Sequence, residues 1–395
     1  MTSLANTTFN ASQISVDAGG FLRVAQQTTL ADLKILNHDR PDVWENAGTG
    51  TGTFIVNKFN MNVTSGQWYI KQTKRRYAYF SGKSQRVEQT FDGFGLDANV
   101  TKRVGYFSSN AVSPFDSDYD GFWLENNGTS IILKCSRLGV ETLSIDISNW
   151  SGYAQLAEYQ NFSTWDNFTV IEWKFLWLGG AVLVLSIKNS RGFVEAHRFN
   201  YSGTSADTFI ASPSQPVRYE IRSSTGTGDL RYVCSQVASE GSIEESGSGL
   251  SVFNATSITT NTIGTIYALI GVRKSMSYRD NAILITSVNV ANTASTDAGI
   301  LMLIINPTLS ASLTYSANSE IEVAYATNQT ITANTGRVIA AVPIANSAGG
   351  TDLMRNNFLG WLSSTLNNTS DQYVLAYRPT TSNQSVNGVI SLKEF

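Results

Sequence analysis

The sequence predicts an all-β protein that consists of an extended N-terminal arm and two β-sandwich domains of jelly-roll or lectin-like layout. Strand-length runs with alternating apolar and polar residues recur along the chain, and turn sequences rich in Gly, Asn and Ser separate them. The second half holds no credible helical pattern longer than 352–362. A chain of 395 residues is also long enough for two or three domains with cores of their own.

The segment 1–53 shows little periodicity and is rich in Asn, Thr, Gly and Ala. We interpret it as an extended arm, and disorder is the alternative. Within it, the short run 30–36 has the length of one or two helical turns. An arm with so few apolar residues has no core of its own, so we expect it to lie along a neighbouring subunit or to anchor the protein.

The first β-sandwich is expected to span 54–241. It opens with four strand-like runs and a hairpin, whose Asn126-Asn127-Gly128 turn supplies the backbone conformation that a tight hairpin needs. The runs are 54–59, 68–80, 85–91 and 102–107, and the hairpin spans 121–137. A polar and aromatic segment, 149–166, follows without strict alternation, which predicts a long loop with one short strand or helix.

The best-defined part of this domain is an antiparallel meander within 165–220. Turn sequences at 178–180 and 189–192 divide it into three strands, and the run 182–187 is apolar on both faces, which favours the central position. A fourth strand is expected at 217–222, where apolar and charged residues alternate. We expect the core to contain Trp173, Phe175, Leu183, Leu185, Tyr219 and Ile221.

An acidic, Gly/Ser-rich segment marks the domain boundary, and we predict a flexible linker over 242–254. The second β-sandwich should occupy 255–395, with seven strands at 265–272, 282–290, 299–305, 320–326, 337–344, 373–377 and 389–392. The run 299–305 is apolar on both strand faces, so it needs an interior position or a neighbouring subunit to cover it.

The composition excludes several function classes. A net charge of −3 gives no overall attraction to nucleic acid or to an anionic membrane, and no stretch is apolar enough for a membrane span. The first residues do not resemble a signal peptide. Cys135 and Cys234 lie in strand-like runs, which favours buried thiols over a disulfide, and His38 and His197 stand in unrelated contexts.

Three short motifs resemble binding sites, and each has a plainer interpretation. The run 80–84 ends in Gly-Lys-Ser, but it lacks the first Gly of a phosphate loop and precedes a strand, so a β-turn is favoured. The acidic run 116–121 has the start of a calcium loop without the distal Glu, which favours a solvated turn. The basic, aromatic run 68–79 is interpreted as a strand with one aromatic face and one solvated or subunit-facing face.

No pattern predicts an enzyme, a metal site or a cofactor. Four carboxylates, Asp146, Glu172, Glu195 and Glu220, have the chemistry of a glycosidase pair, but their spacing selects no two of them. We interpret them as strand residues facing solvent. Aromatic side chains offer a different kind of site. The candidates for stacking on sugar rings are Trp150, Tyr153, Tyr159 and Trp165.

The order of several motifs within 68–241 resembles a family of virion structural proteins from tailed phages and large DNA viruses. The motifs are 71–76 (KQTKRR), 82–85 (GKSQ), 102–107 (KRVGYF), 121–125 (GFWLE), 177–180 (WLGG), 197–199 (HRF), 216–221 (PVRYEI) and 234–241 (CSQVASEG). Two departures, an Asn110-Ala111 pair with a longer acidic insertion and Gly241-Ser242, fall in turns. They affect the expected loop shape more than the expected fold.

This resemblance implies a structural component of a viral particle, such as a capsid-decoration, fibre or tail-associated protein. It would be assembled in the host cytoplasm, located in the virion and bound to other virion proteins, and a homotrimer is favoured over a dimer. The alternative is a carbohydrate- or receptor-binding adhesin module that recognises a host-surface glycan. The two functions are compatible in a fibre that contacts the host.

Overall fold

The computed structural model describes residues 27–35, 39–109, 118–177, 182–202, 207–241, 247–278, 280–292, 298–345, 348–352, 360–366 and 369–395. These residues form two compact units. The N-terminal unit lies within 1–73 and 79–244, and the C-terminal unit lies within 74–78 and 245–395. The predicted division near residue 241 is therefore close to the observed one, except that the short segment 74–78 belongs to the C-terminal unit.

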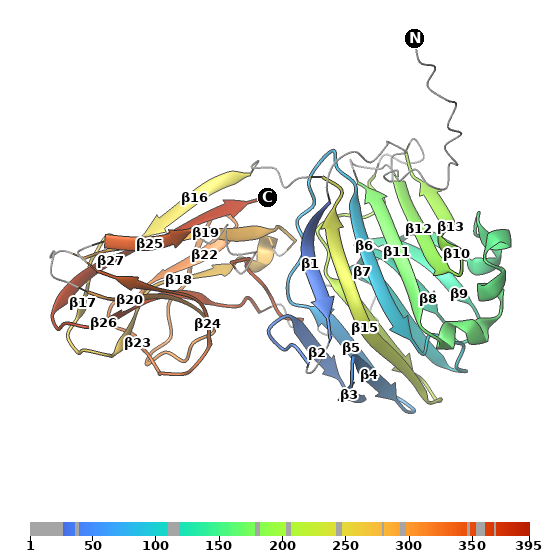
Figure 1. Cartoon of the computed structure of the whole chain (residues 1–395), viewed down its shortest axis with the longest axis horizontal. Coiled ribbons are helices and arrows are strands. Elements are labelled where there is room, and N and C mark those ends of the chain that lie inside the picture. The colour runs from blue at the N-terminus through green and yellow to red at the C-terminus, as the bar shows by residue number, and fades with distance from the viewer. Residues whose placement is uncertain are drawn as a thin grey trace, which may run out of the picture. The chain divides into compact units, whose positions relative to one another are not determined.

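The N-terminal unit consists of two antiparallel sheets (Figure 1). The eight-stranded sheet has the order β13 (Gly192–Asn200), β12 (Val182–Asn189), β11 (Thr169–Leu176), β6 (Gln85–Asp92), β15 (Gly228–Ser239), β4 (Lys58–Val63), β3 (Thr51–Ile55), with β1 (Thr28–Lys34) paired to β15. The seven-stranded sheet has the order β10 (Val140–Asp146), β9 (Ile131–Arg137), β8 (Tyr119–Asn126), β7 (Val100–Ser109), β14 (Val217–Ser223), β5 (Trp68–Thr73), β2 (Trp44–Gly48).

The predicted arm is wrong over 28–53, because this segment supplies β1, β2 and most of β3. Strand β1 replaces the expected helical turns, since its backbone pairs along β15 and its side chains Leu30 and Leu33 are buried. Strand β2 buries Trp44, whose ring packs against Tyr219 and Tyr232. A few well-spaced apolar residues are sufficient to fix these strands at sheet positions that the rest of the unit already provides. Residues 1–26 of the predicted arm lie outside the described residues.

The predicted meander and core are confirmed. Strand β12 lies between β11 and β13, and the hairpin of β8 and β9 turns at Gly128, which has a φ of 85°. All six predicted core residues are buried: Trp173, Phe175, Leu183, Leu185, Tyr219 and Ile221. The fourth predicted strand, β14, belongs to the opposite sheet and faces β15, where the ring of Tyr219 packs against Tyr232 and its hydroxyl hydrogen-bonds with Ser235. The segment between β10 and β11 forms 3-10 turns, within the predicted loop.

Lys71 of β5 does not face solvent, contrary to the interpretation of the basic run. Its side chain is fully buried between the sheets, and Nζ lies 2.8 Å from Asp39 Oδ1 and 3.1 Å from Asn46 Oδ1. The ammonium group also lies over the rings of Phe59 and Trp44, at 3.8 and 5.3 Å. An anion, an amide oxygen and two ring faces together offset part of the loss of hydration that burial of this charge imposes.

The C-terminal unit is a second sandwich, and every strand predicted for it is present. One sheet has the order β16 (Ser248–Phe253), β27 (Gln384–Glu394), β19 (Ile283–Asn292), β25 (Ala348–Asp352), with β17 (Ile258–Thr260) paired to β27. The other has the order β21 (Ser316–Asn318), β22 (Ile321–Tyr325), β18 (Ile266–Lys274), β26 (Tyr373–Pro379), β20 (Gly299–Ile305), β24 (Arg337–Ile344), with β23 (Thr330–Ile331) paired to β18. The linker prediction is wrong over 248–253, which forms β16.

Strand β20 is covered on both faces by its own unit. Leu301 and Leu303 belong to the core between the sheets, whereas Met302 and Ile304 pack on the opposite face with a cluster that includes Leu313. The chain between β20 and β22 therefore covers the second face of the sheet. The need for a neighbouring subunit, inferred from the apolar run alone, does not arise at this strand, and the homotrimer keeps only the support of the resemblance.

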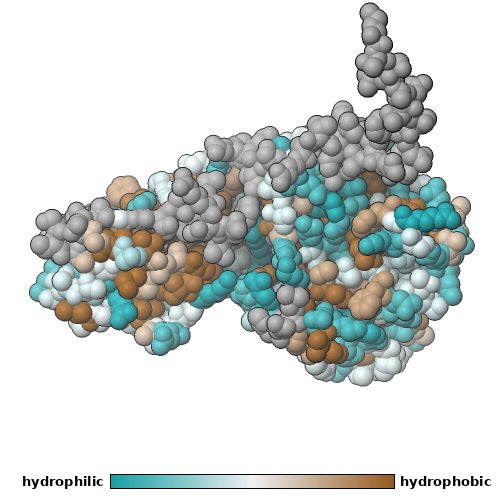
Figure 2. All heavy atoms as spheres, in the orientation of Figure 1, coloured by the Kyte–Doolittle hydropathy of each residue, from teal (hydrophilic) through white to brown (hydrophobic). Residues whose placement is uncertain are grey.

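The surface of the described residues carries both hydrophobic and hydrophilic side chains. On the face that Figure 2 shows, hydrophobic residues occur in small groups between hydrophilic ones. Exposed examples include Val56 and Phe168. Among the residues described, no helix combines the length and the hydropathy of a membrane span.

The buried Lys71 predicts a pH-dependent stability. Burial lowers its pKa from 10.5 to about 8, although Asp39 acts in the opposite direction. Between these pH values the unfolded chain binds a proton that the folded protein does not, so the unfolding free energy rises with pH. The slope should reach up to about 1.4 kcal/mol per pH unit.

Urea unfolding at pH 7, 8, 9 and 10 measures this rise. The control is the double variant Lys71→Met with Asp39→Asn, which removes the ammonium group without leaving an unpaired carboxylate in its place. The difference in unfolding free energy between wild type and variant should grow in favour of wild type from pH 8 to pH 10. Parallel curves would contradict a lowered pKa of Lys71 in the folded protein.

Candidate functional site

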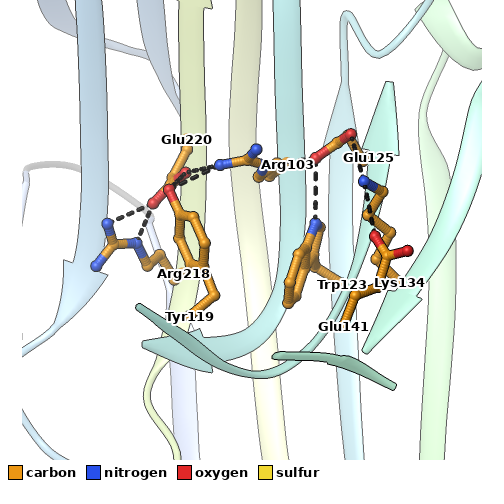
Figure 3. Close-up of polar contacts among 8 residues, drawn as sticks. All are labelled: Arg103, Tyr119, Trp123, Glu125, Lys134, Glu141, Arg218 and Glu220. Atoms are coloured by element: carbon orange, nitrogen blue, oxygen red, sulfur yellow. Dashed lines mark hydrogen bonds and ion pairs between the residues drawn. The ribbon is translucent and has the colours of Figure 1, made fainter. Parts of the chain in front are cut away.

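The outer face of the seven-stranded sheet in the N-terminal unit carries a row of ionised side chains with alternating sign (Figure 3). The strands place them near one another because pairing puts Arg103 opposite both Glu220 and Glu125. On the following strand, Lys134 lies opposite Trp123 and diagonal to Glu125. We name this the charge row, and its members in order are Arg218 and Glu220 of β14, Arg103 of β7, Glu125 of β8, Lys134 of β9 and Glu141 of β10.

Each ion in the charge row contacts ions of opposite sign. Arg103 donates from Nε to Glu125 Oε2 at 2.7 Å and from Nη1 to Glu220 Oε2 at 3.3 Å. Arg218 pairs with the other oxygen of Glu220 and donates from Nη1 to Gln72 Oε1 at 2.7 Å.

At the other end of the charge row, Lys134 Nζ lies 3.3 Å from Glu125 Oε1 and 3.2 Å from Glu141 Oε2. The row therefore runs without interruption across five neighbouring strands.

Aromatic rings pack around the row and limit its contact with water. Tyr119 Oη lies 2.7 Å from Arg103 Nη1 and 3.2 Å from Glu220 Oε2, and Trp123 Nε1 lies 3.5 Å from Glu125 Oε2. The rings of Phe107, Tyr119 and Trp123 form a small cluster of their own, with centroids 5.1 to 5.8 Å apart. The guanidinium group of Arg103 lies over the ring of Tyr119 at 4.7 Å. These contacts fix the orientation of the charged groups.

Two glycines allow β7 and β8 to approach each other closely beside the ring cluster. Gly105 is opposite Trp123, and Gly121 is opposite Phe107. A Cβ atom at Gly105 would lie 2.6 Å from Trp123 Cα, and one at Gly121 would lie 2.6 Å from Phe107 Cα. Gly121 also has a φ of 125°, which favours glycine. The backbone at these two positions therefore leaves room that any other residue would fill.

Burial changes along the charge row. The side chain of Glu220 is 0% exposed and that of Arg218 is 2% exposed, whereas those of Lys134 and Glu141 are 21% and 53% exposed. Burial raises the pKa of Glu125, but the positive charges of Arg103 and Lys134 outweigh this effect and hold it below its usual value. Burial and the charge of Glu220 raise the pKa of Tyr119, which keeps its hydroxyl protonated. The row thus has a closed end on β14 and an accessible end on β9 and β10.

The four aromatic residues predicted to stack on sugars do not lie on this face. Trp150, Tyr159 and Trp165 are buried, and each donates a hydrogen bond to a backbone carbonyl of the unit. Tyr159 and Trp165 also pack edge to face, 5.0 Å apart. Their ring faces are therefore occupied by protein. Tyr153, in the 3-10 helix Tyr153–Gln155, is half-buried, and sugar stacking stays a prediction for this residue alone.

Two of the four candidate carboxylates do not face solvent. Glu220 and Glu172 are buried, and each is ion-paired: Glu172 pairs with Arg86 and Lys174 on the eight-stranded sheet. Glu195 forms an exposed pair with Arg198, and Asp146 accepts hydrogen bonds from Ser148. Glu172 and Glu195 lie in one cross-strand row, on either side of Ser186 of β12. The carboxylate next to Glu220 is Glu125, which sequence spacing could not select because the pairing of β7 with two strands distant in sequence brings them together.

The other motifs have structural roles. The run 80–84 is a turn, with Lys83 N donating to Phe80 O at 3.1 Å. Asp120 accepts hydrogen bonds from Ala211 N and Ser212 N, and the start of its acidic run lies outside the described residues. Within the described chain, no group of three or more His, Cys, Asp or Glu side chains has the geometry to hold a metal ion.

His197 accepts a hydrogen bond from Ser151 N, and burial lowers its pKa. Cys135 and Cys234 are free thiols, as predicted, although Cys234 is only half-buried. None of these three side chains belongs to the charge row.

The sequence matches no known protein family and no curated protein. The structure is similar to solved β-sandwich domains. The carbohydrate recognition domain of Emp47p is 14% identical, with a TM-score of 0.35, and the match covers 58% of this chain and 98% of that chain. The legume lectin-like domain from Entamoeba histolytica is 10% identical, with a TM-score of 0.35 and coverages of 54% and 98%. These similarities concern the fold alone, and the antiparallel sheets of the two units confirm the predicted all-β class.

A prokaryotic β-1,3-1,4-glucanase derived from a mouse hindgut metagenome has a similar relation to this chain. It is 10% identical, with a TM-score of 0.34, and the match covers 51% of this chain and 95% of that chain.

The closed end of the charge row predicts a large loss of stability when one ion is removed. Glu220→Ala would leave Arg218 and Arg103 without their shared carboxylate in a buried position, so the unfolding free energy should fall by about 3–5 kcal/mol. Glu195→Ala, which breaks an exposed ion pair on the other sheet, should change it by less than about 1 kcal/mol. Urea unfolding of the two variants measures both values, and equal small losses would contradict a buried network.

Proposed function

We propose that this chain is a non-enzymatic carbohydrate-binding protein, with its ligand held at the accessible end of the charge row. The observation that carries this proposal is the half-exposed pair of Lys134 and Glu141 beside Glu125 and the ring of Trp123. A cation and a carboxylate 3.2 Å apart present a hydrogen-bond donor and an acceptor next to each other. Lys134 lies opposite Trp123 in the sheet and also pairs with Glu125, so these contacts fix its position before a ligand arrives.

Sugar hydroxyls suit such a surface because each of them both donates and accepts hydrogen bonds. Two hydroxyls on neighbouring ring carbons can donate to Glu141 and accept from Lys134, and charge-assisted bonds of this kind are stronger than neutral ones. A preformed donor and acceptor need little reorganisation on binding. The geometry therefore supports recognition of a polyhydroxylated ligand.

The same geometry supports binding rather than hydrolysis. Glycoside hydrolysis needs one carboxyl group that stays protonated at working pH and a second one that acts as nucleophile or base. Glu125 and Glu220 each pair with two cations, and the pKa of Glu125 is below its usual value. A carboxylate that is held ionised by neighbouring cations is a poor proton donor.

An array of immobilised neutral and acidic glycans tests the proposal with the full chain. We expect binding of at least one glycan class, and Lys134→Met should weaken that binding at least tenfold because the donor at the accessible end is lost. Lys188→Met is the matched control, since this exposed lysine lies on the eight-stranded sheet. Absence of binding, or equal binding by the two variants, would contradict the proposed site. Thermal unfolding verifies that both variants are folded.

The second candidate function is a structural component of a viral particle. Its support is that three of the segments that resemble virion proteins, 102–107, 121–125 and 216–221, belong to β7, β8 and β14, the strands that bear most of the charge row. The resemblance and the site thus involve the same part of the fold. A particle component that binds glycans would be an adhesin or fibre in contact with the host, with other virion proteins as partners and a homotrimer as the favoured assembly.

Mass spectrometry of purified virions tests this candidate. A particle component should be present at a fixed copy number per particle after gradient purification and high-salt washing. A chain detected only in the infected-cell lysate would contradict a place in the virion. Light scattering of the purified protein separately tests the homotrimer, which a monomer at micromolar concentration would exclude.

A further inference from the structure

We infer that the glycan bound at the charge row is neutral, and that the site discriminates against acidic sugars such as uronic and sialic acids. This inference rests on the proposed function and adds the ligand class. It follows from the net charge of the row and from the carboxylate partners that each of its cations already has. Both can be followed from one end of the row to the other in Figure 3.

The charges of the row cancel. Its three cations, Arg218, Arg103 and Lys134, stand against three carboxylates, Glu220, Glu125 and Glu141, so 3 − 3 leaves a net charge of zero. Because the signs alternate from strand to strand, the potential also cancels over short distances. Such a surface offers strong local hydrogen-bonding groups but no net attraction for an anion.

Each cation of the row has a carboxylate partner in contact with it. Arg103 lies between Glu125 and Glu220, and Lys134 lies between Glu125 and Glu141. A ligand carboxylate at Lys134 would therefore approach within reach of two protein carboxylates, which repel it. A neutral hydroxyl meets no such repulsion and can bond to either sign.

The buried end cannot rearrange to accept an anion. Arg103 is held by Glu125, Glu220 and Tyr119 and lies over the ring of Tyr119. Moving its guanidinium group toward a ligand would leave both glutamates with fewer partners in a setting that excludes water. The only members of the row with substantial exposure are Lys134 and Glu141, and they contribute one charge of each sign.

A matched pair of probes tests the inference: an acidic polysaccharide that contains uronic acid, and the same polysaccharide after its carboxyl groups are reduced to hydroxymethyl groups. The full chain should bind the reduced form at least tenfold more tightly than the acidic parent. Because the ligand carries no charge, this affinity should change less than about twofold between 50 and 500 mM salt.

Glu141→Gln changes the net charge of the row from zero to +1 and removes the carboxylate that repels an acidic ligand at the accessible end. It should lower the affinity ratio of reduced to acidic polysaccharide at least fivefold. Glu195→Gln removes an exposed carboxylate from the eight-stranded sheet and should leave the ratio unchanged. An unchanged ratio in Glu141→Gln would overturn the assignment of selectivity to the row.

The failures of this inference and of the proposed function are distinguishable. Binding of acidic glycans as tightly as neutral ones, or more tightly, would overturn the neutral-ligand inference and leave the binding function in place. Absence of binding to both forms and to the complete glycan array would overturn the proposed function and this inference with it.

Discussion

The pairing register of the seven-stranded sheet is the constraint on which the charge row depends. A shift of one residue in β7 would turn Arg103 into the core and bring Val104 to the outer face, and the row would lose its central ion. With the observed register, charges that would be costly to bury singly are buried together. The site therefore depends on the pairing register more than on any single side chain. Gly105 and Gly121 support this register because they let β7 and β8 approach each other closely.

Both units bury polar side chains besides their apolar clusters, and in the C-terminal unit these include Asn254, Thr260, Lys274 and Gln384. In the N-terminal unit, Gln89 accepts a hydrogen bond from Trp173 Nε1 and donates to Gly105 O, and Lys102 donates to the carbonyls of Gly93 and Gly95. These bonds specify one arrangement of strands, because a displaced strand would leave the polar groups unpaired.

Local patterns in the sequence were sufficient to predict the fold class, the meander, the hairpin, the core and the strands of the C-terminal unit. They failed where a residue's environment depends on partners far away in the chain. Alternation predicted that Glu220 would face away from the core, which is correct, but only the pairing of β14 with β7 reveals that it is buried against Arg103. Lys71 was misplaced for the same reason, because Asp39 and the ring of Phe59 come from other segments.

The position of β1 has a consequence for synthesis on the ribosome. Its partner strand comes from the far end of the unit, and Thr29 and Gln236 bond across 207 residues of sequence. Translation proceeds at about 5–20 residues per second, so roughly 10–40 s pass between the synthesis of β1 and the synthesis of β15. During that interval Leu30 and Leu33 stay exposed, as does Trp44, whose neighbours Tyr219 and Tyr232 are also still missing. The segment that forms β1 and β2 is therefore the part of the nascent chain most open to chaperone binding or to incorrect strand pairing.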